Sequence, residues 1–379
     1  MMKKYLIASA LLLFFLTSYA KVPAKRVSVP ASDPRITWIG RTSAYEGSVA
    51  FDWTGTYGKV RFIGNTLSFS VSDSKKNYYN VWLDSTMDAV PDKVLAVYGK
   101  DTTIVIFSED EIRARYKKDS RAIFGPHQVI LQKRTEGEQG KTTVHCFTTN
   151  GEFLQADAPK DRIIEFIGDS YTCGYGTEAS CTERFSPETE NQNLTYACEA
   201  ARYFGADQIV IAHSGIGIAR NFNGDLSGDH MPERYLRTFD SEKDSRWDAA
   251  ACSLKPDITV IYLGTNDFSR NLQPSKRQFT RNYISLLKEI KDNYGAGHPV
   301  LCISPKHDFV MQEYILNAIN TSGFENVHFV GLSPSIHNDK EDMGADGHPN
   351  YSGHTKLAYN VIPYISTVTG WEMSGNEVK

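Results

Sequence analysis

The hydrophobic pattern of this chain changes character between residues 154 and 162. Before that point, from about residue 35, β-branched and aromatic residues alternate with polar ones in short runs such as SVAFDWTG, YYNVWLDS and HQVILQKR, which Gly, Asn, Asp or Ser residues separate. A period of two with this punctuation is typical of short antiparallel strands. We therefore predict an all-β jelly roll, that is a β-sandwich, over residues 30–154. The charged stretch 109–115 could form one helical turn or more.

Short continuous apolar runs follow the change of pattern, and segments with helical spacing separate them. The runs read IIEFI, QIVIA, ITVIYLG, VLCIS and VHFVGL. Residues 279–290 give the clearest helix, because Tyr283, Leu286, Leu287 and Ile290 fall on one face. Buried strands that alternate with helices predict an α/β domain over residues 160–379, with a parallel sheet flanked by helices.

The first twenty residues, MMKKYLIASALLLFFLTSYA, have the layout of a secretory signal peptide. Lys3 and Lys4 precede an apolar run, and Ser18 and Ala20 supply small residues for cleavage. The run is shorter than the roughly 20 apolar residues that a membrane span needs. We expect residues 1–20 to be removed and the mature protein to be secreted or periplasmic, with no membrane anchor.

Charge and cysteine content bear on possible partners. Lys and Arg number 41 and Asp and Glu 45, a net charge of -4, so the basic excess expected of a nucleic-acid-binding protein is missing. The six cysteines lack the paired CxxC spacing of a zinc site. Export permits disulfides. We expect some buried free thiols, with room for one bridge among Cys173, Cys181 and Cys198.

Polar motifs follow several of the strand-like runs, and parallel strands bring such positions to one edge of a sheet. The first motif, Gly168-Asp169-Ser170, comes directly after IIEFI. A serine at a strand-to-helix turn can present its hydroxyl together with its own N–H, as a nucleophile and half an oxyanion hole. The same tripeptide also suits an ordinary helix cap.

Two further motifs carry groups that can hold an oxyanion. Ser214 to Gly217 follows QIVIA, and either Gly215 or Gly217 can bring a backbone N–H close to a ligand or simply make a tight turn. Asn266, in LGTND after ITVIY, has an amide that can donate to an oxyanion or form an Asx turn.

The last motif is Asp346-Gly347-His348-Pro349. A histidine can accept the proton of a serine near neutral pH, and a carboxylate can orient its ring. Pro349 shapes the turn and favours His348 over His354, which we expect at the start of the last helix. The remaining histidines have no shared spacing, and we interpret them as solvated or structural.

Taken together and in this order, the Ser, Gly, Asn and Asp-His motifs resemble the four blocks of the SGNH or GDSL-type hydrolases. One residue separates Asp346 from His348, whereas the broad pattern has two. This departure, the continuation YTCGYG after Ser170, and the preceding β-sandwich with Ile39-Gly40-Arg41 narrow the resemblance to carbohydrate esterase family 2. It covers nearly all of the mature chain.

The resemblance implies an exported serine esterase that removes O-acetyl groups from xylan, glucomannan and related poly- or oligosaccharides. Ser170 would be the nucleophile, His348 the general base, and Asp346 the residue that orients His348, although some family members use a backbone carbonyl instead. The implied oxyanion donors are the Ser170 N–H, the N–H of Gly215 or Gly217, and the Asn266 amide. No metal or other cofactor is expected, because the nucleophile is an activated serine.

Aromatic side chains are expected to bind the sugar, and the candidates are Tyr175, Trp247 and Trp371. Two other functions stay open. A lipid, short-chain ester or thioester hydrolase of the GDSL type would be favoured by long apolar lid segments, which the sequence lacks. An inactive carbohydrate-binding protein would have no need to keep the whole set of catalytic residues. The sequence does not decide the sugar, the acetyl position or the role of the jelly roll.

Overall fold

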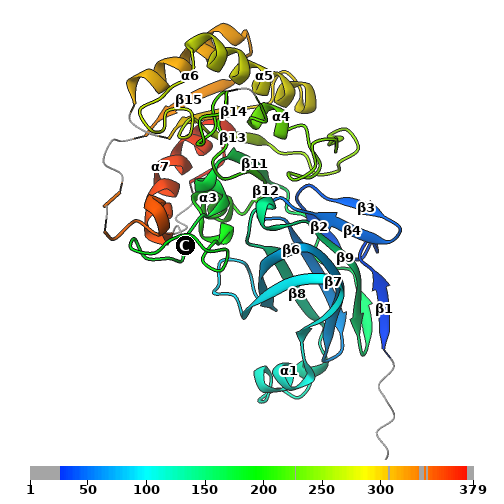
Figure 1. The fold of residues 1–379 in the computed structure, drawn as a ribbon. Helices are drawn as coiled ribbons and strands as arrows, with labels where there is room; N and C mark the ends of the chain where they lie inside the picture. Colours follow the sequence, from blue (N-terminus) through cyan, green and yellow to red (C-terminus); the bar gives the residue numbers. More distant parts are fainter. Residues whose placement is uncertain (1–25, 227, 306–307, 333–336, 339, 374–379) are drawn as a thin grey trace, which may run out of the picture.

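The computed structural model describes residues 26–226, 228–305, 308–332, 337–338 and 340–373. The signal peptide predicted for residues 1–20 lies outside them. Figure 1 shows a β-rich part, drawn in blue to green, beside an α/β part that contains the later strands and most of the helices. Within the described residues, no helix has the length and apolar character to cross a membrane.

The β-rich part is built on one antiparallel sheet that folds over on itself. Its strands follow the order β10-β5-β8-β6-β9-β4-β3, with β1 on β9, β2 on β5 and β7 on β6. The first half of β6 pairs with β9 and its second half with β8. The strands are β1 Val27–Pro30, β2 Thr37–Ile39, β3 Ser43–Tyr45, β4 Ser48–Phe51, β5 Tyr57–Ile63, β6 Leu67–Leu83, β7 Lys93–Phe107, β8 His127–Lys133, β9 Thr142–Thr149 and β10 Glu152–Leu154.

The alternation in the sequence explains this sandwich. Along β6 the residues from Leu67 to Val71 are buried at every second position, and Phe69 and Val71 join the buried core of the β-rich part. The predicted jelly-roll or sandwich class is confirmed. The charged stretch forms α1, Glu109–Arg115, which starts with a capping box between Ser108 and Glu111.

The α/β part has a parallel sheet in the order β12-β11-β13-β14-β15. Each strand is one of the five apolar runs: β11 Ile163–Gly168, β12 Asp207–Ala212, β13 Ile258–Tyr262, β14 Val300–Ser304 and β15 Val327–Gly331. The predicted flanking helices are also present, so the predicted α/β class is confirmed. The helices are α2 Ser170–Cys173, α3 Tyr196–Tyr203, α4 Met231–Arg234, α5 Lys276–Tyr294, α6 Phe309–Ser322 and α7 Tyr351–Thr369.

The two faces of the parallel sheet have separate cores. Helices α5 and α6 pack with Ile167 and Ile261 on one face, and α3 and α7 pack with Phe166 and Val260 on the other. The stripe predicted for α5 is fully buried, with Tyr283, Leu286, Leu287 and Ile290 all at 0% exposure. This arrangement leaves the carboxyl ends of the strands for the loops that carry the polar motifs.

The six cysteines are all free thiols. Cys173 and Cys198 are buried, whereas Cys181 is exposed. The bridge considered among these three residues is therefore absent. The large cores on both faces of the sheet make such a bridge unnecessary for a chain of this size.

Buried contacts join the two parts of the molecule. Ile39, Trp53 and Tyr57 of the β-rich part belong to the same apolar cluster as strands β11 and β12. The Tyr57 hydroxyl donates a hydrogen bond of 2.5 Å to Asp207 at the start of β12, and the Trp53 indole N–H donates to the Thr238 carbonyl at 3.0 Å. The β-rich part therefore supports the α/β part along a packed interface.

Candidate active site

Ser170 is the first residue of α2 and follows the last residues of β11. Asp169 caps this short helix, because its side chain accepts a hydrogen bond from the Tyr171 N–H at 3.1 Å. Gly168 is needed for the sharp turn, since a Cβ there would lie 1.9 Å from the Thr172 hydroxyl oxygen. The strand-to-helix turn thus places the Ser170 hydroxyl at the carboxyl edge of the sheet, where it is 5% exposed.

His348 reaches Ser170 from the opposite end of the sequence. Its Nε2 lies 2.8 Å from the Ser170 Oγ, a hydrogen-bond distance suited to proton transfer. The His348 N–H donates to Ala345 and its carbonyl accepts from Gly344, which fixes the backbone of this loop. Tyr175 lies against the imidazole, with the ring centroids 4.2 Å apart. The structure therefore brings together the two residues predicted as nucleophile and base.

Asp346 forms part of the wall beside His348. Its carboxylate accepts hydrogen bonds from the Arg184 guanidinium at 2.7 Å, the Phe185 N–H at 3.0 Å and the Tyr175 hydroxyl at 3.3 Å. The hydrogen bond from Arg184 lowers the pKa of Asp346 below its usual value. Burial, together with the Asp346 charge, raises the pKa of Tyr175 to about 12, so Tyr175 keeps its hydroxyl proton. A direct role for Asp346 in orienting His348 stays a prediction.

Asn266 lies near Ser170 in the loop after β13. Its side-chain amide donates to the Ile216 carbonyl at 2.7 Å, which holds the amide against the loop after β12. The next acceptor of the same nitrogen is Asp169, at 3.4 Å, a weak contact. Since an amide nitrogen carries two hydrogens, the second can be offered to an oxyanion that forms at Ser170.

The structure distinguishes between Gly215 and Gly217, the two glycines that the sequence left as alternative oxyanion donors. The N–H of Gly217 already donates to the Asn221 side chain at 2.9 Å, so its prediction as an oxyanion donor is wrong. Gly215 instead lines the same cavity as Ser170 and Asn266. Its φ of +76° suits glycine and turns the chain at the cavity wall. Gly215 is therefore the remaining candidate in this loop.

Sequence reasoning missed the residue that holds this loop in shape. The buried carboxylate of Asp267 accepts the backbone N–H groups of Ile218 at 2.9 Å, Ala219 at 2.7 Å and Arg220 at 3.0 Å. Burial raises the pKa of Asp267 to about 6. Its place directly after Asn266 in the LGTND motif was the signal that could have identified it.

The cavity above Ser170 has a volume of about 640 Å³. Tyr175 lines it, as does Phe222, which is 46% exposed and which the sequence analysis did not single out. The other lining residues include Tyr171, Arg184, Ser214, Thr265, Ser269 and Gly347. The cavity combines an apolar ring surface with polar groups around the serine, which is typical of small-ligand sites.

Two predicted sugar contacts lie elsewhere. Trp247 borders a separate cavity with Trp38 and lies over the Arg41 guanidinium, 5.2 Å from it. Trp371 follows α7 and packs against Phe204 and Arg162. Neither lines the cavity at Ser170, so their assignment as substrate contacts at this site is wrong. Trp247 packs instead against an arginine, and Trp371 packs against an arginine and a phenylalanine.

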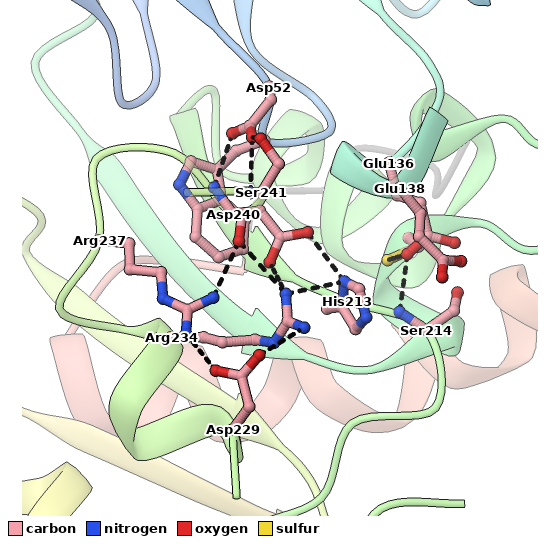
Figure 2. A network of polar contacts seen from close by, with 12 residues as sticks. Asp52, Glu136, Glu138, His213, Ser214, Asp229, Arg234, Arg237, Asp240 and Ser241 are labelled. Carbon is pink, nitrogen blue, oxygen red and sulfur yellow. Dashed lines mark hydrogen bonds and ion pairs between the residues drawn. The ribbon is translucent and has the colours of Figure 1, made fainter. Parts of the chain in front are cut away.

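The other histidines near the site are structural. His354 lies in the first turn of α7, as expected, and burial lowers its pKa to about 3. His213 follows β12, and its Nδ1 lies 2.8 Å from Asp240 (Figure 2). Burial opposes a charge on His213, but the Asp240 carboxylate outweighs it and raises the pKa. Of the two roles left open for His213, solvated or structural, the structure shows the structural one, because His213 is largely buried in an ion-pair network.

One group among the described residues has the donor atoms of a metal site. The side-chain donor atoms of Glu136, Cys173 and Glu190 lie within 4.8 Å of one another, and all three residues are buried. Burial raises the pKa values of Cys173 and Glu190 well above their ordinary values, which opposes the loss of their protons. Metal ligands have to be deprotonated. The chemistry of this group therefore favours a hydrogen-bonded cluster over a metal site.

Two family models match the chain. The model described as carbohydrate esterase 2 N-terminal matches residues 38–159. The model of the GDSL-like lipase/acylhydrolase family matches residues 166–356, just over half of the chain. The first match covers most of the β-rich part, and the second begins within β11 and ends within α7.

Relatives match across both parts of the molecule. The cellulase/esterase CelE of Acetivibrio thermocellus is 31% identical over 330 residues, which cover 84% of this chain and 38% of that protein. The chain thus spans less than half of this relative's length. An acetylxylan esterase / glucomannan deacetylase of Cellvibrio japonicus is 24% identical over 349 residues, which cover 91% of this chain and 92% of that protein.

The fold agrees with a solved structure over nearly the same extent. A family two carbohydrate esterase from Clostridium thermocellum in complex with cellohexaose superposes with a TM-score of 0.76 at 28% identity. The match covers 89% of this chain and 100% of that one. With both family models and these relatives in agreement, the chain belongs to carbohydrate esterase family 2, within the GDSL or SGNH-type hydrolases.

Proposed function

We propose that this protein is an exported serine esterase that removes O-acetyl groups from hemicellulose-type polysaccharides or oligosaccharides such as xylan and glucomannan. The observation that carries the proposal is the 2.8 Å contact between His348 Nε2 and Ser170 Oγ at the base of an open cavity. The Cellvibrio japonicus relative, an acetylxylan esterase / glucomannan deacetylase, supports the substrate class. The signal-like sequence of residues 1–20 supports export.

In the first half of the reaction, Ser170 Oγ attacks the acetyl carbonyl carbon while His348 takes the hydroxyl proton. The tetrahedral oxyanion lies between the Ser170 N–H, the Gly215 N–H and the Asn266 amide. The intermediate then collapses, His348 gives its proton to the departing sugar oxygen, and the acetyl group stays on Ser170. Donors that are already in position stabilise the charge without reorganisation.

In the second half, water attacks the acetyl-serine and His348 accepts a proton from that water. Collapse of the second intermediate releases acetate and returns the proton to Ser170. We propose that Asp346 acts in both halves through Tyr175. Its carboxylate holds the Tyr175 hydroxyl and Arg184, and the Tyr175 ring packs on the imidazole. No metal or cofactor has a role in these steps.

The lining of the cavity suits a substrate in which a small acyl group is attached to a sugar. Phe222, which is 46% exposed, offers a ring surface that suits the apolar face of a pyranose, while Arg184 and Ser269 offer hydrogen-bonding groups. The ring of Tyr175 is already packed against His348 and Phe185. Such a mixed lining favours sugar substrates over long acyl chains, which need a longer apolar surface.

The test compares p-nitrophenyl acetate, butyrate and octanoate as substrates for the wild type and for Ser170→Ala. Acetate release from acetylated xylan and acetylated glucomannan is then measured with both proteins. We expect hydrolysis of the acetyl ester and acetate release from at least one polysaccharide, both lost in Ser170→Ala. Preference for octanoate would contradict the proposal in favour of a lipid hydrolase. A wild type that hydrolyses no ester but binds oligosaccharides would point to a binding protein.

A further inference from the structure

The loop after β12 carries the candidate oxyanion donor Gly215, and it is held by groups from the β-rich part. The loop begins at His213 and Ser214, directly beyond the end of β12 at Ala212. It has no regular secondary structure of its own, so its shape depends on side chains that bind its backbone. Displacement of a catalytic group by about 1 Å can cost on the order of 100-fold in rate.

The first of these groups is Glu136. This residue lies after β8 in the β-rich part and is 1% exposed. Its Oε2 accepts the N–H of Ser214 at 2.7 Å, the peptide directly before Gly215 (Figure 2). The same oxygen lies 3.6 Å from the Cys173 sulfur, and Cys173 ends the helix that begins with Ser170. One carboxylate therefore contacts both segments that supply backbone donors to the oxyanion.

The second group acts on His213, the residue before Ser214. His213 is bound to Asp240 at 2.8 Å. Asp52, which directly follows strand β4 of the β-rich part, accepts the N–H groups of Asp240 at 2.8 Å and Ser241 at 2.9 Å. Figure 2 shows this chain of contacts beside Glu136. Two carboxylates of the β-rich part thus hold the same loop, one directly and one through Asp240.

The packing around Glu136 leaves it little freedom. The next residue, Gly137, lies so close to Asp240 that a Cβ there would be 2.6 Å from the Asp240 carboxylate oxygen. The Glu136 N–H donates to Glu190 at 3.2 Å, and Lys133, which is fully buried, donates to the Glu136 carbonyl at 2.9 Å. Hydrogen bonds therefore fix both the backbone and the carboxylate of Glu136.

We propose that Glu136 is a positioning residue for deacetylation, which sets the place of the Gly215 N–H by binding the Ser214 N–H. This inference rests on the proposed function and deepens it, because it assigns the β-rich part a share in the oxyanion hole. A brace that only stabilised the fold would change the melting temperature of the protein. A positioning group also changes kcat, because the oxyanion forms only after the substrate is bound.

The experiment uses three full-length variants, Glu136→Gln, Glu136→Asp and Glu136→Ala. Gln keeps an acceptor oxygen at the same reach, Asp withdraws the carboxylate by one methylene, and Ala removes it. We expect Gln to keep kcat for p-nitrophenyl acetate within about threefold, and Asp and Ala to lose roughly tenfold or more with KM little changed. If Ala fails to fold, Asp, which keeps a carboxyl group at this position, carries the test.

A second measurement does not depend on turnover. Phenylboronic acid adds to a serine oxygen and forms a tetrahedral anion that occupies the oxyanion hole. Its inhibition constant should rise in the Asp and Ala variants by about the factor that kcat loses. The matched control is Tyr57→Phe, which removes another buried hydrogen bond between the two parts, at the far end of β12. It should lower the melting temperature and leave both kinetic quantities within twofold.

The result that would overturn the inference is folded Asp and Ala variants with kcat and boronate affinity within twofold of the wild type. Loss of kcat in Gln equal to that in Ala would also overturn it, because the acceptor oxygen would then have no effect. A failure of the proposed function would show in the wild type, as the absence of Ser170-dependent acetyl ester hydrolysis. A failure of this inference would show only among variants of an active wild type.

Discussion

Replacement of Asn266 tests the oxyanion hole most directly. The Asn266 amide donates a hydrogen bond of 2.7 Å to the Ile216 carbonyl and makes only a weak contact of 3.4 Å with Asp169, so an oxyanion can compete for its second hydrogen. Loss of one such donor in a buried site costs about 3 kcal/mol, or about 100-fold to 1,000-fold in kcat. We expect Asn266→Ala to lose kcat by this factor and to keep KM, because the donor acts on the transition state.

Asn266→Asp should lose more than Asn266→Ala. Its carboxylate would lie near the Asp169 carboxylate and the Ile216 carbonyl, and it would repel the oxyanion instead of stabilising it. The assay is hydrolysis of p-nitrophenyl acetate over a range of concentrations, so that kcat and KM are obtained separately.

The matched control is Asn282→Ala. Asn282 also donates its side-chain amide to a carbonyl of the loop after β12, that of Ile218 at 2.9 Å, but it lies on α5 and does not line the cavity. Its loss should lower the free energy of unfolding by about 1 kcal/mol and leave kcat within threefold. The reasoning would be refuted if Asn266→Ala kept kcat within threefold, or if the whole loss appeared in KM.

Three further predictions concern the wall of the cavity and the core. Asp346→Asn should lower kcat by about tenfold or less in the same assay, because Asp346 acts through Tyr175; a loss near the roughly 10⁴ of a disrupted triad would show direct orientation of His348. Phe222→Ala should raise KM for acetylated xylo-oligosaccharides and leave KM for p-nitrophenyl acetate unchanged; equal changes would argue against a sugar platform. Burial raises the pKa of Glu199 from 4.5 to about 8, so the folded chain keeps a proton that the unfolded chain releases between these values. The free energy of unfolding, measured by urea denaturation, should therefore fall as pH rises from about 5 to 8, and Glu199→Gln should flatten this dependence.

The parts of the molecule that could be predicted are those with a local signal. The five parallel strands are short apolar runs. The buried stripe of α5 is visible in the sequence because its four apolar residues, Tyr283, Leu286, Leu287 and Ile290, recur at helical spacing. Ser170 and His348 were identifiable because each belongs to a short motif next to a strand or a helix. These elements depend on residues that are close together in the sequence.

The parts that could not be predicted depend on contacts between distant segments. Nothing near Glu136 in the sequence indicates that its carboxylate binds the backbone N–H of Ser214, which lies 78 residues further along the chain. The choice between Gly215 and Gly217 was decided by the Asn221 side chain, which takes the Gly217 N–H. Residue type alone also misplaced Trp247, because an indole packs equally well on a sugar or on an arginine.

The interface also determines which pieces of this chain can exist separately. The Arg41 guanidinium, 1% exposed, donates to the Tyr235 and Arg237 carbonyls and lies 3.4 Å from the fully buried Glu165 carboxylate on β11. An α/β part produced alone would keep Glu165 in its core without this cation, at a cost of several kcal/mol. We therefore expect the two parts to occur together as one unit in larger proteins. In the much longer Acetivibrio thermocellus relative, the similarity extends over 84% of this chain.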